Sequence, residues 1–121
     1  VACAAALKVL DQLEGGLMDR AIAMGDKLQS LLTAAVGEHP HVGEVRGRGL
    51  IWAVELVSSR EELGAAPMLR NTVLQDCFRQ GLRVNGCGAS TVAMAPAHTV
   101  TEDELAGAVE IFAEVLDKAT S

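Results

Sequence analysis

The spacing of apolar residues is the feature of this 121-residue sequence that most limits its possible folds. In four long segments apolar residues recur every three to four positions, which is the spacing of an amphipathic helix. Between them lie short apolar runs with β-branched members, which are typical of buried strands. The pattern predicts helices over 1–14, 17–37, 67–80 and from 101 onward, and strands over 50–54, 82–84 and 91–95.

The order of these elements predicts one α+β domain. The strands are few and mostly joined by short loops, so we expect a small, mainly antiparallel sheet with helices packed on one face, a two-layer arrangement. A chain of 121 residues that is half hydrophobic has the usual size for one domain and can bury a core. With two Phe, one Trp and no Tyr, that core must be mainly aliphatic.

Several local features mark where the helices begin and end. Gly15-Gly16 breaks the first helical run, Pro67 suits the first turn of the third helix, and Gly81 ends it. Thr101 with Glu104 three residues later fits a capping box, so the last helix begins there. Gly47 and Gly49 flank the first strand and indicate a bulge or a close backbone approach.

The same periodicity predicts which residues of each helix face the core. The expected inward positions are Leu17, Ala21, Met24, Leu28, Leu31 and Ala35 in the second helix, Leu69, Val73, Cys77 and Phe78 in the third, and Leu105, Val109, Phe112 and Leu116 in the last.

Charge and composition exclude several classes of partner. The formal net charge is −6 and no basic cluster is present, which argues against nucleic acid and anionic membranes as partners. No apolar run approaches the roughly 18 residues of a membrane span. Three cysteines without a CxxC pair indicate a reducing compartment, so we expect a cytoplasmic protein whose cysteines are small apolar fillers.

No motif in the chain forms an active site by itself. The three histidines, His39, His41 and His98, lack other ligands at metal-binding spacing, so we expect solvated loop histidines and no metal site. The three lysines, Lys8, Lys27 and Lys118, have polar neighbours on predicted helices, whereas a Schiff-base lysine needs a desolvated or specially charged pocket. We therefore predict no catalytic and no cofactor-binding residue.

The first residues suggest that more chain precedes them. The sequence opens at Val1 inside an apolar helical run, without Met and without a capping residue in front. We expect it to be a piece of a longer protein.

Four segments resemble the C-terminal part of the class III (ω- and ornithine-type) aminotransferases. Residues 1–7 are similar to the helix that follows the family's Gly-Asn-Pro segment, and Gly43–Leu56 is similar to its Val-Arg-Gly-x-Gly-Leu strand. Gln80–Val84 resembles a further family strand, and Ala95–Leu105 resembles the start of its closing helix. These motifs follow the family's order and span nearly the whole chain.

The resemblance implies a fold type I enzyme that uses pyridoxal phosphate (PLP) and works as a homodimer. Residues 1–121 would be the C-terminal small domain, which covers the active-site cleft and shapes the substrate pocket. The large domain, absent from this chain, would bind PLP and supply the Schiff-base lysine. The parent would move an amino group between an amine or amino acid and a keto acid, and the fragment alone would be inactive.

One departure from the family concerns the substrate carboxylate. Many members hold it with an arginine that, by alignment on Ala95-Pro96, falls at Ala93 in this chain. Either the carboxylate is held elsewhere, with Arg83 the nearest arginine in sequence, or the amine donor has no carboxylate at that end. The candidate substrate-pocket residues are Arg48, Arg83 and Ala93.

Two alternatives stay open at this point. Ala97-His98-Thr99 resembles the glutamate-1-semialdehyde aminomutase branch, so the parent could be an aminomutase or a decarboxylase of the same fold. A free-standing α+β interaction module is the other, because fold alone does not fix function.

Overall fold

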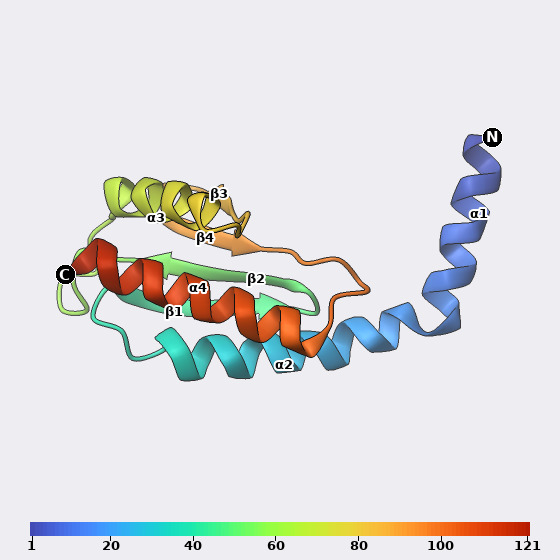
Figure 1. Cartoon of the computed structure of the whole chain (residues 1–121), viewed down its shortest axis with the longest axis horizontal. Helices are drawn as coiled ribbons and strands as arrows, with labels where there is room; N and C mark the ends of the chain where they lie inside the picture. Colours follow the sequence, from blue (N-terminus) through green and yellow to red (C-terminus); the bar gives the residue numbers. More distant parts are fainter.

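The computed structural model describes all of residues 1–121 and contains the four predicted helices. The chain segments that connect the helices contribute the strands of one four-stranded sheet (Figure 1). In chain order the elements are α1 (Ala2–Gln12), a π-helical turn η1 (Leu13–Leu17), α2 (Met18–Val36), β1 (Val42–Arg48), β2 (Ile51–Leu56), α3 (Pro67–Arg79), β3 (Asn85–Cys87), β4 (Thr91–Met94) and α4 (Glu102–Thr120).

The sheet has the order β1-β2-β4-β3, and every neighbouring pair is antiparallel. Figure 1 shows α2, α3 and α4 together on one side of it, while α1 stands away from the body. Trp52, Val54 and Leu56 alternate along β2 and are buried, which marks the covered face. The predicted two-layer α+β domain is confirmed.

The core lies between this face of the sheet and the helices. α4 contributes Leu105, Val109, Phe112 and Leu116, as predicted, and Phe112 and Leu116 are completely buried. All but two of the 18 residues in the core cluster, Trp52 and Phe112, are non-aromatic, as the shortage of aromatic residues requires. Burial of these side chains is the main force that holds the sheet to the helices.

The prediction of a single strand near residue 50 was incomplete, because residues 42–56 form a β-hairpin. β1 and β2 pair in register from Glu44 with Glu55 to Arg48 with Ile51. β1 escaped prediction because only Val42 is buried in it; a bulge after Val42 shifts the register, and its other side chains border solvent. A strand with a single buried side chain shows no apolar alternation in its sequence.

The strand predicted over Leu82–Val84 is wrong, since the third strand lies at Asn85–Cys87, between the two predicted strands. The backbone N–H of Leu82 donates to the carbonyl of Cys77 at 2.8 Å and so completes the end of α3. Pairing with β4 begins only at Asn85, opposite Ala93.

Two predicted inward positions are also wrong. Ala35 is exposed, because the buried stripe of α2 continues in steps of four beyond Leu28, through Leu32 to Val36. Phe78 on α3 is 70% exposed, while Val73 and Cys77 are buried as predicted.

The expectation for Gly49 is confirmed by the backbone. Gly49 turns the β1–β2 hairpin with φ +57°, a conformation that L side chains rarely adopt, and its carbonyl accepts a hydrogen bond of 2.8 Å from Trp52 Nε1. The close approach is made by α2, since Gly25 faces this carbonyl.

The capping box at the start of α4 is present as predicted. Glu104 N–H donates to Thr101 Oγ1 at 3.1 Å, and Glu104 Oε1 accepts from Thr101 N–H at 3.3 Å. We expect Thr101→Ala to lower the free energy of unfolding by about 1 kcal/mol, because a first-turn N–H loses its acceptor. Urea denaturation measures this, and a larger loss for Glu104→Ala than for Thr101→Ala would contradict the assigned cap.

Candidate functional site

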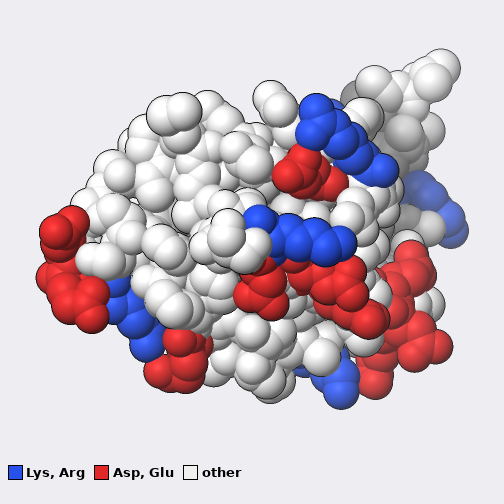
Figure 2. Space-filling model, turned by 60° about the vertical axis from the view of Figure 1, so that its left-hand side comes forward, with Lys and Arg blue, Asp and Glu red and all other residues white.

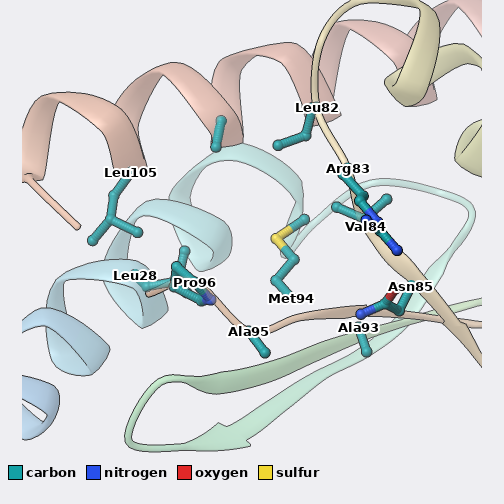
Figure 3. Close-up of a pocket in the computed structure, with 11 residues that line it drawn as sticks. Leu28, Leu82, Arg83, Val84, Asn85, Ala93, Met94, Ala95, Pro96 and Leu105 are labelled. Carbon is teal, nitrogen blue, oxygen red and sulfur yellow. The ribbon is translucent and has the colours of Figure 1, made fainter. Parts of the chain in front are cut away.

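A cavity of about 310 Å³ opens where the end of β4 separates from the segment before β3 (Figure 3). Its inner wall is aliphatic and comes from α2, α4 and β4, and its rim carries the polar side chains of Arg83 and Asn85. The complete lining is Leu28, Leu82, Arg83, Val84, Asn85, Ala93, Met94, Ala95, Pro96, Leu105 and Ala108.

The cavity exists because the sheet splits at this point. Asn85 pairs with Ala93, but no backbone hydrogen bond joins Leu82–Val84 to the chain beyond Met94. Leu82 is held instead by the end of α3. Consequently the chain before β3 diverges from β4, and a space remains between them that apolar side chains line.

The rim of the cavity offers one cation with free hydrogen-bond donors. Arg83 is exposed and takes part in none of the ion pairs of the structure. Ala93 is half-buried, and Figure 3 shows its methyl group on the opposite side of β4 from Met94. A guanidinium beside an apolar hollow can hold a carboxylate in two hydrogen bonds while the hollow accepts aliphatic atoms.

The three candidate pocket residues do not lie together. Arg83 and Ala93 line the same cavity, whereas Arg48 is at the end of β1 and lines a separate groove with Ile51 and Trp52. The strand order places β2 between β1 and β4, so Arg48 and Ala93 belong to strands that are not neighbours.

The uncovered face of the sheet carries a charge cluster that the sequence did not reveal. Arg46 Nη1 donates to Glu55 Oε2 at 2.7 Å and to Glu44 Oε2 at 3.0 Å. The hydrogen bond to Glu55 is the main cause that raises the pKa of Arg46 above its usual value. Figure 2, which shows another side of the molecule, likewise has Lys and Arg side chains beside acidic ones.

His39 is not the solvated loop histidine that the sequence predicted. Its side chain is only 12% exposed, and its Nε2 lies 3.1 Å from Asp117 Oδ1 on α4. The ring of His41 is within 3.1 Å of the carbonyl of Val57. Both rings therefore fasten the loop between α2 and β1, and no group of three or more His, Cys, Asp or Glu is arranged to hold a metal.

Of the three cysteines, only Cys77 is a small apolar filler of the core, as predicted. Cys77 is completely buried, and burial raises the pKa of its thiol to about 11. Such a thiol stays protonated at neutral pH and is a poor nucleophile. Cys3 and Cys87 are exposed and are not core fillers. None of the helices has the length and hydropathy that a membrane span requires.

Sequence reasoning missed Asn85 and the aliphatic wall of the cavity. Asn85 lies outside the predicted strands, because a three-residue strand has too few residues to show alternation. The sequence predicts inward positions for Leu28 and Leu105 and a strand position for Met94. Nothing in their spacing indicates that they surround a cavity.

Comparison with known proteins identifies relatives over the full length of the chain. The family profile described as "Aminotransferase class-III" matches residues 1–116. The acetylornithine aminotransferase of Synechocystis sp. is 35% identical over 118 residues, which cover 96% of this chain and 26% of that protein. The (R)-1-hydroxy-2-aminoethylphosphonate ammonia-lyase of Vibrio splendidus is 28% identical over 119 residues, covering 98% of this chain and 25% of that protein.

The fold has solved counterparts as well. A Bacillus anthracis aminotransferase superposes with a TM-score of 0.92 at 30% identity, covering 97% of this chain and 28% of that one. The chain thus spans about a quarter of the length of the relatives it matches.

Proposed function

Because this chain belongs to the class-III aminotransferases, we propose that it serves as the small domain of a PLP-dependent transaminase. The whole protein would move an amino group from an amine or amino acid to a keto acid. The observation that carries this proposal is the match of 97% of the chain, at a TM-score of 0.92, to about a quarter of a solved aminotransferase.

The role of the small domain follows from the cavity at the end of β4. Here an unpaired cation, Arg83, borders an aliphatic hollow, and Ala93 adds no second charge to its lining. We assign to this surface the shaping of the substrate pocket. Arg83 would hold a substrate carboxylate, because an ionised group in a water-poor cleft needs a charge partner.

The residues of this chain do not fit the covalent attachment of PLP. Lys8, Lys27 and Lys118 are all exposed on helices, Lys27 lies 4.0 Å from Glu102, and none of them lines the cavity. A Schiff-base lysine needs a desolvated or specially charged pocket, which these exposed side chains lack. The residues that bind the cofactor and the catalytic lysine would therefore both lie outside this sequence.

Two further parts of the proposal concern assembly and location. The whole protein would be a homodimer, which is the arrangement that the family resemblance implies. Its small-molecule partners would be amines and keto acids. Three free cysteines suit a reducing compartment such as the cytoplasm.

A lyase is the second candidate, and one relative favours it. The Vibrio splendidus protein named as an ammonia-lyase is 28% identical over nearly the whole chain. A segment similar to this chain therefore occurs in a protein named for a reaction that releases ammonia. A transaminase needs a keto acid to complete its cycle, whereas a lyase turns over without one.

The test is to assay the full-length protein with PLP and a panel of amines, with and without a keto acid. We expect amino acid formation that depends on the keto acid and no free ammonia. Ammonia release without a keto acid would favour the lyase, and no turnover of any amine would contradict both. The isolated 121-residue chain, reduced with borohydride in the presence of PLP, should show no stoichiometric adduct on any single lysine by mass spectrometry.

A further inference from the structure

α1 and α2 are two helices with different directions, joined by the turn η1 (Figure 1). The bend lies at Gly16, which has φ +131° and ψ −13° inside an otherwise helical run. The residues on both sides, such as Leu13 and Met18, have right-handed helical angles. The change of direction therefore depends on one residue.

The two glycines of the turn differ only in their backbone angles. A methyl group added to either Gly15 or Gly16 would meet no atom within 4 Å, so neither is required by packing. Gly16 alone has a positive φ. An L-residue at that angle is strained whatever the space around it, whereas an alanine at Gly15 is not.

α1 is packed only weakly against the rest of the domain. None of its residues is buried, and Leu7, Val9 and Leu10 are each more than half exposed. α2, by contrast, is anchored near its beginning, because Arg20 Nη2 donates to the carbonyl of Val100 at 2.6 Å. The turn thus joins a helix held by the body to one that has no residue buried against it.

We propose that Gly16 is a joint that sets the direction of α1 relative to the domain. An L-residue there would relieve its strain by adopting the helical φ of its neighbours, which would merge α1, η1 and α2 into one straight helix. The surrounding Leu13, Glu14 and Met18 favour helix and would support that change. The joint is a property of the chain's own backbone and needs no ligand.

The joint would matter for activity only through the proposed function. If α1 connects this domain to the rest of a transaminase, the angle at Gly16 determines how the rim with Arg83 and Ala93 faces the remaining active site. In the full-length enzyme, Gly16→Ala should then lower kcat/KM about tenfold or more, the scale expected when a reacting group is displaced by an ångström or more. Gly15→Ala should leave it unchanged.

The direct test is a distance measurement on the 121-residue chain. Cys3 on α1 and Cys87 on β3 are exposed, whereas Cys77 is buried, so spin labels attach at the two informative positions without new cysteines. Double electron–electron resonance then gives the distance between α1 and the sheet. α1 has 11 residues and is about 16 Å long at 1.5 Å per residue. Gly16→Ala should therefore shift the distance peak by roughly 5–10 Å, and Gly15→Ala should retain the wild-type peak.

Three results of these measurements would contradict the proposal that Gly16 is a joint. An unchanged peak in Gly16→Ala would show that other contacts fix α1, and an equal shift in Gly15→Ala would show that any methyl group in the turn acts alike. A loss of far-ultraviolet ellipticity in Gly16→Ala would mean that α1 unfolds and does not extend α2. Because this measurement involves no activity, a shifted peak with unchanged kcat/KM would confirm the joint and count against the proposed role in the enzyme.

Discussion

Gly25→Ala is expected to lower the free energy of unfolding by roughly 3 kcal/mol or more, at or above the upper end of overpacking in cores. Gly25 is buried on α2, and a methyl group there would come within 1.9 Å of the carbonyl oxygen of Gly49. The obstacle is backbone, and Gly49 holds the hairpin turn at φ +57° with its carbonyl bonded to Trp52. The hairpin cannot yield without giving up that bond.

Gly107→Ala is the matched control for this prediction. Gly107 also lies within a helix, α4, but a methyl group there meets no atom within 4 Å. Alanine should therefore stabilise the protein by up to about 1 kcal/mol through helix propensity. Urea unfolding of both variants gives the comparison, and equal midpoints for Gly25→Ala and the wild type would show that α2 and the hairpin do not press together.

The second large effect concerns the substrate. In the full-length enzyme, Arg83→Ala should raise KM about 10- to 100-fold for an amine donor that carries a carboxylate, the equivalent of the 1.5–3 kcal/mol of a hydrogen bond to a charged group. Donors without a carboxylate should change by less than about threefold, since they lose no charge partner. Steady-state kinetics with paired donors of similar length measures the difference.

Two further variants complete this test. Arg48→Ala removes an exposed arginine that lies outside the cavity and should affect neither class of donor. Ala93→Arg adds a second guanidinium beside the rim that Arg83 borders, and its bulk and charge should reduce activity on simple amines while carboxylate donors lose less. If Arg83→Ala affects both classes equally, Arg83 does not hold the carboxylate.

The local sequence was sufficient for the helices. Thr101 and Glu104 fix the start of α4 through bonds that span only three residues, so their spacing alone reveals them. Pro67 begins α3, and the extreme stiffness of its ring makes that position independent of the fold. Gly49 needed a positive φ, which again is a property of one residue.

The strands and the cavity were less accessible. β3 exists because Asn85–Cys87 finds β4 as a partner, and the strand predicted over Leu82–Val84 fails because the same stretch completes α3. Both outcomes depend on bonds to residues distant in the chain. The cavity between Arg83 and Met94 is a consequence of that divergence, so no pattern in either segment could indicate it.

What the sequence by itself determined are the features with short-range causes: helix caps, glycine turns, the aliphatic core composition and the family motifs over residues 1–7, 43–56, 80–84 and 95–105. The tertiary structure alone decided that Arg83 and Ala93 line one cavity while Arg48 lies apart. It also decided that Leu32 and not Leu31 is fully buried, and that Gly25 lies against the carbonyl of Gly49. The physical reason is that periodicity states how residues are spaced along an element, whereas the rotation of a helix and the pairing of a strand are set by the surface that each one meets.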